Sequence, residues 1–205
     1  MIDVIGTDAG APASLPAAQQ ALIRAAEQIA APRRLQPALE TWLKSPVPLI
    51  DSDDPRHLVE VLSALSAQTN AVVLASGDPL WFGIGRILAE RLGPERLRFH
   101  PAPTCLQLAF ARIGRPWQDA RWVSLHGRDP EPLARELQTR PRALAVLTDP
   151  GRGGADTVRR CLRSSGLEAS YQLWLGENLG RADERMRLIP ADAPLPEPLQ
   201  PLLVA

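Results

Sequence analysis

The chain has 205 residues (22.3 kDa) and carries 23 basic and 23 acidic side chains, so its formal net charge is zero when the histidines are neutral. This balance argues against a general nucleic-acid-binding protein, and no apolar run approaches the roughly 18 residues that a membrane-spanning helix needs. The two cysteines, Cys105 and Cys161, belong to no zinc-binding motif and the N-terminus lacks a secretion signal, so we expect a cytoplasmic protein without a bound metal.

Short apolar runs alternate with amphipathic helical patterns from the first residue onward, which is typical of α/β proteins with parallel sheets. In the first half we expect strands at 1–5, 47–50, 71–75 and 97–100, and helices that begin at Pro16, Asp54 and Thr104. The helix from Pro16 is expected to place four apolar residues on one face, namely Leu22, Ala25, Ala26 and Ile29.

The same alternation restarts in the second half of the chain. We expect strands near 122–125, 143–147 and 171–175, and helices near 132–138 and 156–163. A polar stretch after a helix stop at Gly114 predicts a domain boundary between 115 and 116, which gives an N-terminal domain of 1–115 and a C-terminal domain of 116–205. The proline-rich stretch 190–201 is expected to run over the surface without forming a helix.

Segments that follow predicted strands are the candidate sites, because ligands of open parallel sheets bind at the carboxyl ends of the strands. Three such segments stand out: Gly6–Gly10 (GTDAG), Ala75–Gly85 (ASGDPLWFGIG) and Ser124–Arg128 (SLHGR). None matches the GxGxxG dinucleotide fingerprint. Each also has a structural interpretation: the glycines supply positive φ, Asp78 caps a turn, and His126 is a hydrogen-bonded structural residue.

An ordered set of segments carries a resemblance to a known family. These segments are Ala75–Pro79 with Gly83, Pro103–Arg112, Gly114 with Pro116–Asp119, Ser124–Arg128, Leu147–Asp149 and Gly176–Gly180. Together they resemble the CbiE family, the precorrin-6Y (precorrin-7) C5-methyltransferases of cobalamin biosynthesis, which also form the amino-terminal half of CobL enzymes. The SGDP sequence alone is typical of all tetrapyrrole methylases, whereas HGR and PWQD indicate this branch.

The resemblance implies a class III methyltransferase of two α/β/α domains, with S-adenosylmethionine in the cleft between them. It implies that the donor contacts Gly77, Asp78, Pro79, Thr104, Cys105, Leu147 and Thr148. The implied substrate is a precorrin that carries many carboxylates, for which the candidate contacts are Arg33, Arg112, Arg128 and Asp8. Methyl transfer to an electron-rich ring carbon needs little side-chain catalysis, but His126, with Asp78 second, is our candidate base for removing a proton afterwards.

The opening loop departs from the family pattern. That pattern resembles GxGPG followed by Leu-Thr, whereas this chain has GTDAG at 6–10 and then Leu15-Pro16, so Asp8 would narrow or recharge the substrate site. Two alternatives therefore stay open: methylation of another tetrapyrrole carbon, or a non-catalytic donor-binding scaffold. The resemblance also implies a homodimer and a separate C15-methyltransferase that removes a carboxylate, because the chain stops at Ala205 before such a domain.

Overall fold

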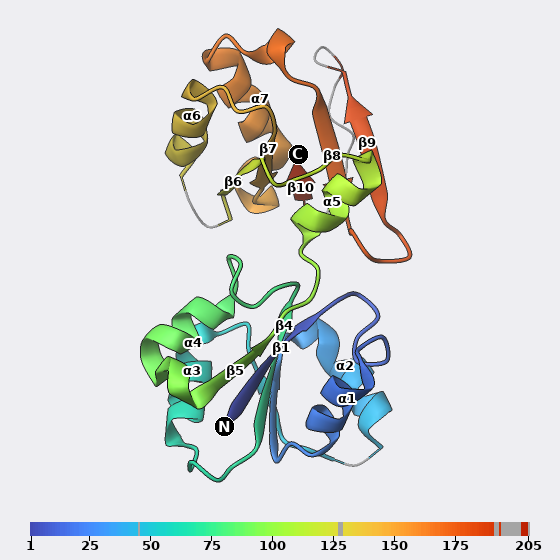
Figure 1. Cartoon of the computed structure of the whole chain (residues 1–205), viewed down its shortest axis with the longest axis vertical. Helices are drawn as coiled ribbons and strands as arrows, with labels where there is room; N and C mark the ends of the chain where they lie inside the picture. The colour runs from blue at the N-terminus through green and yellow to red at the C-terminus, as the bar shows by residue number, and fades with distance from the viewer. Residues whose placement is uncertain (45, 127–128, 191–192, 194–201, 205) are drawn as a thin grey trace. The chain divides into compact units, whose positions relative to one another are not determined.

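The computed structural model describes residues 1–205 except 45, 127–128, 191–192, 194–201 and 205. The chain divides into two compact units, Met1–Thr104 and Cys105–Ala205 (Figure 1). The sequence places the boundary at 115/116, after the helix that Thr104 introduces, whereas the structure divides the chain before it. The reason is that this helix, α5 (Cys105–Ile113), lies with the second unit, where its Arg112 pairs with Glu184.

The first unit is a parallel sheet with helices on both faces. In the described residues the strand order is β3-β2-β4-β1-β5, and every neighbouring pair is parallel. The elements are β1 (Ile2–Thr7), α1 (Ala17–Arg24), β2 (Gln28–Ala31), η1 (Arg33–Leu35), α2 (Gln36–Leu43), β3 (Leu49–Asp51), α3 (Pro55–Ala64), β4 (Ala71–Ser76), α4 (Ile84–Leu92), η2 (Pro94–Arg96) and β5 (Leu97–His100).

Strand β4 shows why the sheet needs helices on both sides. Its residues are buried on alternate faces: Val72 and Leu74 pack in one apolar cluster with α1 and α2, and Ala71 and Val73 pack in the other with α3 and α4. Figure 1 shows these two helix pairs on opposite faces of the sheet. The prediction of a strand buried on both faces at 71–75 is therefore confirmed.

Two features of the first unit differ from the sequence-based expectation. The helix from Pro16 ends at Arg24, and Ile29 lies instead in β2, between β3 and β4. Alanine-rich segments fit a helix as well as a buried strand, so only the tertiary pairing decides between them. Helices α2 and α4 were not among the expected elements.

The second unit is a mixed sheet. In the described residues its strand order is β6-β7-β10-β8-β9, with β6 and β7 parallel and the other neighbouring pairs antiparallel. Helices α6 and α7 pack on one face through four leucine and valine side chains, Leu133, Leu137, Val158 and Leu162. The elements after α5 are β6 (Arg121–Ser124), α6 (Glu131–Gln138), β7 (Leu144–Leu147), η3 (Pro150–Arg152), α7 (Gly154–Ser164), η4 (Glu168–Ser170), β8 (Leu173–Glu177), β9 (Arg185–Ile189) and β10 (Leu202–Val204).

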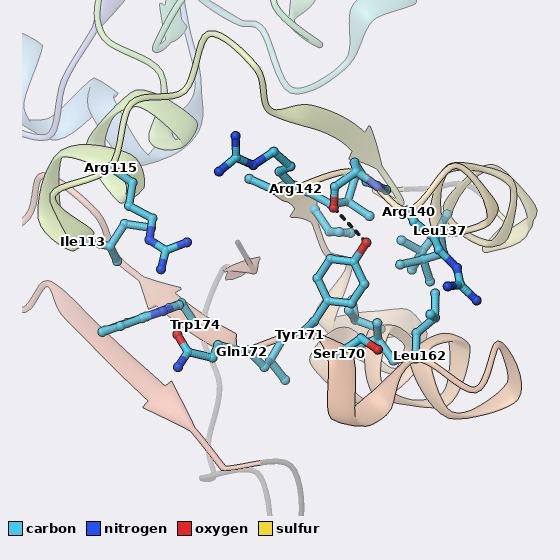
Figure 2. A pocket seen from close by; sticks show the side chains of 18 of the residues that line it. Ile113, Arg115, Leu137, Arg140, Arg142, Leu162, Ser170, Tyr171, Gln172 and Trp174 are labelled. Atoms are coloured by element: carbon cyan, nitrogen blue, oxygen red, sulfur yellow. Dashed lines mark hydrogen bonds between the residues drawn. The ribbon is translucent and has the colours of Figure 1, made fainter.

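Strand β10 is last in the sequence but lies in the middle of this sheet. It pairs with 146–147 of β7 and with 175–177 of β8. A pocket of about 490 Å³ opens beside the amino ends of β7 and β8, next to Leu144 and Leu173 (Figure 2). The predicted course of 190–201 lies outside the described residues except for Pro190 and Ala193.

Candidate active site

The carboxyl ends of β1 and β4 form the switch point of the first sheet. These strands are neighbours, in register from Ile2 with Ala71 to Thr7 with Ser76. The chain leaves β1 toward α1 on one face and leaves β4 toward α4 on the other (Figure 1). Such a divergence opens a crevice at the strand ends, which is where doubly wound sheets bind ligands.

Glycines bring three backbone segments together at this switch point. The Gly77 amide donates a 2.9 Å hydrogen bond to the Thr7 carbonyl, and Gly77 has φ +62°. A Cβ on Gly77 would lie 3.3 Å from Cα of Thr104, and one on Gly6 would lie 2.1 Å from the Gly77 carbonyl oxygen. The structure thus places Gly77 beside Thr104, two residues for which the family resemblance implies a shared donor site.

The loop after β4 is folded around Asp78 and Pro79. The Asp78 carboxylate accepts a 2.8 Å hydrogen bond through Oδ1 from the Leu80 amide, which confirms its predicted role in the turn. The Pro79 carbonyl accepts from the Gly85 amide at 2.9 Å. Leu80 and Phe82 remain exposed, so the loop presents an apolar surface at the carboxyl edge of the sheet.

Asp8 holds its own loop together. Its Oδ1 accepts hydrogen bonds from the Gly10 amide at 2.9 Å and from the Ser14 hydroxyl. The side chain is exposed at the end of β1. One carboxylate oxygen of Asp8 therefore organises the GTDAG loop.

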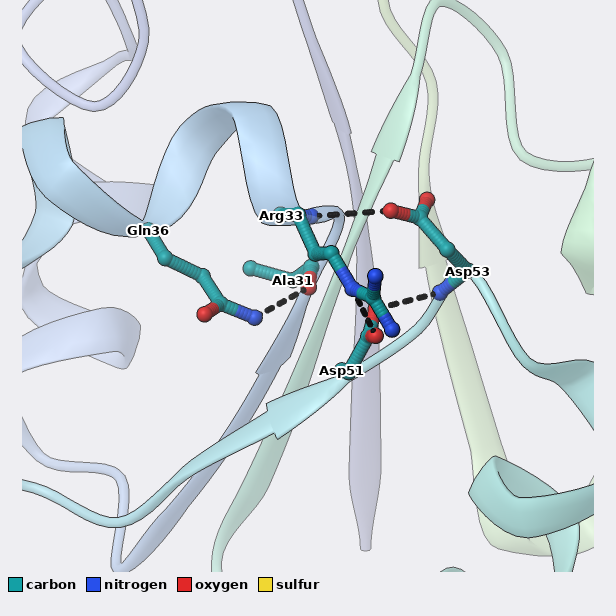
Figure 3. A network of polar contacts seen from close by, with 5 residues as sticks. All are labelled: Ala31, Arg33, Gln36, Asp51 and Asp53. Atoms are coloured by element: carbon teal, nitrogen blue, oxygen red, sulfur yellow. Dashed lines mark hydrogen bonds and ion pairs between the residues drawn. The ribbon is translucent and has the colours of Figure 1, made fainter.

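Arg33 lies at the same edge within a polar network (Figure 3). Its Nε donates to Asp51 Oδ2 at 2.5 Å, and its backbone amide donates to Asp53 at 3.1 Å. Hydrogen bonding from the Asp53 amide, and then from Arg33, lowers the pKa of the Asp51 carboxyl below its usual value. Because the Arg33 side chain is 79% exposed and bonded only through Nε in this network, its terminal nitrogens can bind an anion.

For Arg34 the sequence favours a solvated surface charge, but the structure places it at the candidate site. It donates through Nη2 to the Ser76 hydroxyl at 2.5 Å, directly before Gly77. Arginine pairs after a strand usually indicate solvated charge, and only the neighbouring position of β2 and β4 brings this side chain to the candidate site.

Two other predicted residues have structural surroundings. Burial raises the pKa of the Cys105 thiol, more than hydrogen bonding from backbone amides lowers it, so a thiolate nucleophile is disfavoured. Arg112 forms a two-point ion pair with Glu184, and Glu184 also accepts from the Gly180 amide at 2.6 Å. Its guanidinium thus holds α5 to the loop before β9.

The remaining predicted residues belong to the second unit. Leu147 ends β7, its carbonyl accepts from the Leu125 amide at 2.7 Å, and Thr148 is buried immediately after it. His126 is exposed in the turn after β6, and Arg128 lies outside the described residues. Among the described residues no group of three or more acidic, histidine or cysteine side chains is placed to hold a metal, and no helix has the length and apolarity to cross a membrane.

The sequence matches the tetrapyrrole (corrin/porphyrin) methylases over residues 1–193. The chain belongs to this family. Over 131 residues it is 40% identical to a precorrin-6Y C(5,15)-methyltransferase (decarboxylating) from a Sinorhizobium species. The matched residues make up 64% of this chain and 30% of that protein. Over 122 residues it is 35% identical to a cobalt-precorrin-7 C(5)-methyltransferase of Salmonella typhimurium, and this match makes up 60% of this chain and 58% of that protein. The chain thus matches less than two thirds of the length of these relatives.

The fold of this tetrapyrrole methylase also resembles solved structures. A cobalamin-biosynthesis precorrin-6Y methylase from Archaeoglobus fulgidus matches with a TM-score of 0.68 and 22% identity, over 100% of this chain and 96% of that chain. At this identity the likeness concerns the fold, and it confirms the predicted α/β fold of the class III methyltransferases.

Proposed function

We propose that this methylase transfers a methyl group from S-adenosylmethionine to C5 of a late precorrin in cobalamin biosynthesis. The observation that carries the proposal is the packing of Gly77 against Thr104 at the switch point, in a chain that is 40% and 35% identical to methyltransferases named for C5. Both residues lie in segments on which the resemblance to these enzymes rests.

The residues at the switch point suit a donor that has no phosphate. Gly77 leaves the strand end free of side chain, and the second oxygen of Asp78 (Oδ2) has no protein partner among the described residues, so it can accept from a hydroxyl or an ammonium group. We propose Gly77, Asp78, Pro79, Thr104, Cys105, Leu147 and Thr148 as the donor contacts. A protonated Cys105 fits this role as a small, neutral neighbour.

The chemistry makes modest demands on the protein. S-adenosylmethionine supplies the methyl group as a sulfonium, and C5 of a reduced tetrapyrrole is already nucleophilic. The residues therefore act mainly by orienting the two reactants, which contributes up to about 7–11 kcal/mol in favourable cases. We propose His126 as the base that takes the proton lost from the substrate, with Asp78 second, since Asp78 already uses Oδ1 to accept from Leu80.

The polar network of Figure 3 is our candidate for binding the substrate's carboxylates. Arg33 is oriented through Nε and presents its terminal nitrogens, and Arg34 lies beside Ser76. The exposed Leu80 and Phe82 offer apolar contact to the macrocycle. We propose a structural role for Arg112, because its Nε and Nη2 donate hydrogen bonds to the two carboxylate oxygens of Glu184.

Isothermal titration and product analysis test the proposal. We expect the purified protein to bind S-adenosylmethionine and, with ¹³C-methyl donor and a late precorrin, to give a product labelled at C5 in its NMR spectrum. Labelling of a different ring carbon would support the first alternative. No donor binding at millimolar concentration would end the proposal.

Substitution of Asp8 can distinguish an active enzyme from a non-catalytic scaffold. Because its carboxylate organises the loop through Gly10 and Ser14, we expect the natural protein to be active. The variant with Asp8→Gly and Ala9→Pro restores the family pattern and serves as the comparison. If turnover occurs only in that variant, the natural chain is a donor-binding scaffold.

We propose that the protein acts as a homodimer and that a separate C15-methyltransferase takes up its product. Analytical ultracentrifugation of the purified protein measures the first, and turnover in the presence of such an enzyme measures the second.

A further inference from the structure

The pocket of Figure 2 is lined only by residues of the second unit. It opens beside the first residues of β7 and β8, whereas Leu147 and Thr148 lie at the other end of β7. Strand β10 pairs with 146–147 and 175–177, so among the described residues no strand lies between 144–145 and 173–174. The pocket lies at this end of the sheet, beside Leu144 and Leu173.

The inner wall of the pocket is apolar. It consists of side chains from the core of the unit, including Leu133, Leu137, Leu162, Leu167 and Leu173. Tyr171 stands at the rim, where its hydroxyl donates a 2.8 Å hydrogen bond to the Pro141 carbonyl and ties two rim segments together. The volume of about 490 Å³ falls within the range of small-molecule sites, about 300–1,000 Å³.

The rim of the pocket is positively charged. Arg115, Arg140 and Arg142 line it, all three are exposed, and none forms an ion pair with a described carboxylate. In the part of the chain that the structure describes, no aspartate or glutamate lines the pocket. Figure 2 shows Arg115 and Trp174 on one side and Arg140 on the other, with Tyr171 between them. Two other arginines of the same unit, Arg112 and Arg163, pair with glutamates.

We propose that this pocket binds a small amphipathic carboxylate. Its apolar body would lie against the leucine side chains, and its carboxylate would accept hydrogen bonds from the rim arginines, whose planar groups suit a carboxylate. The positive charge of the three rim arginines selects an anion over a cation or a neutral polar molecule. The site is separate from methyl transfer and does not depend on the proposed function.

Isothermal titration with octanoate and decanoate on the whole protein tests this proposal. Each buried methylene adds about fourfold in affinity, so decanoate is expected to bind about tenfold or more tightly than octanoate. The uncharged analogue 1-octanol is expected to bind about tenfold more weakly than octanoate, because it makes no charged hydrogen bond.

Paired arginine variants locate the binding. Arg140→Gln with Arg142→Gln is expected to weaken decanoate binding about tenfold, and these exposed side chains carry little of the fold's stability. The matched control, Arg152→Gln with Arg185→Gln, removes the same charge from exposed positions of the same unit that do not line the pocket. Equal losses in both variants, equal binding of octanoate and 1-octanol, or no decanoate binding at 1 mM would each overturn the proposal.

Discussion

Gly77 and Gly114 have nearly the same backbone conformation but different neighbours. Their φ angles are +62° and +65°, a region that costs any other residue about 1–2 kcal/mol. A Cβ on Gly77 would contact Thr104 at 3.3 Å, whereas one on Gly114 would meet no atom of the described residues within 4 Å. Substitutions at the two glycines therefore distinguish the effect of backbone strain from the effect of crowding at the candidate site.

We expect Gly77→Ala to lower both stability and affinity for S-adenosylmethionine. Urea unfolding should show a loss of about 1–2 kcal/mol for Gly77→Ala and a similar loss for Gly114→Ala. Donor titration should show a loss of about tenfold for Gly77→Ala alone. Equal donor affinity in the two variants would remove Gly77 from the donor site.

Asp51 is expected to act on the substrate through Arg33. Asp51→Asn keeps the shape of the side chain but weakens its hold on the Arg33 Nε, so the KM for the precorrin should rise about tenfold while kcat changes little. Arg33→Gln should raise the KM at least as much, and combining it with Asp51→Asn should raise the KM no further. Arg86→Gln, which removes an exposed pair with Glu90, is the control. A fall in kcat with unchanged KM would contradict this role.

At the scale of elements, a buried carboxylate joins β1 to the edge strand β5. Asp3 accepts from Arg98 at 2.6 and 2.9 Å and contacts His100 Nε2 at 2.7 Å. Burial alone would raise the pKa of the Asp3 carboxyl, but the hydrogen bonds and charges of Arg98 and His100 outweigh it and lower the pKa. The ionised form thus stabilises the contact between these strands.

The stability from Asp3 should depend on pH. Because the folded-state pKa is lowered, this stability is complete above the unfolded pKa of about 3.9 and is lost as the pH falls through the folded-state value. We expect Asp3→Asn to cost about 1–2 kcal/mol at pH 7, at the low end because the Arg98 side chain is 55% exposed. The difference from the natural protein should shrink below about pH 4. Urea unfolding from pH 3 to 7 measures it, and a constant difference would contradict the prediction.

Strand β10 should be the most sensitive element of the second unit. Leu203 is paired on both sides, with Leu147 and Gly176, so Leu203→Pro removes an amide from a central strand. We expect a loss of about 2 kcal/mol or more and faster hydrogen exchange at the amides of β7 and β8. Leu203→Val keeps the amide and should retain protection. Unchanged exchange in the proline variant would show that β10 contributes little.

For the whole molecule, the sequence predicts what local pattern encodes and fails where distant segments decide. The apolar run at 71–75 and the N-cap at Asp54 predict β4 and α3 correctly. The apolar pattern around Ile29 fits a helix as well as a buried strand, and pairing with distant strands decides that it lies in β2. Likewise, nothing in the local sequence shows that α5 lies with the second unit. In the candidate site, the loop after β4 was predicted from its sequence, whereas Arg34 beside Ser76 depends on strand order.

The place of β10 also bears on how the protein is made. Every strand of the first sheet is complete by residue 100, but the middle position of the second sheet is filled by residues 202–204. A ribosome adds these residues after all the other strands of that sheet, so the second unit stays open along β7 and β8 while the first is already able to fold. During synthesis, those exposed strand edges are where we expect a chaperone to bind.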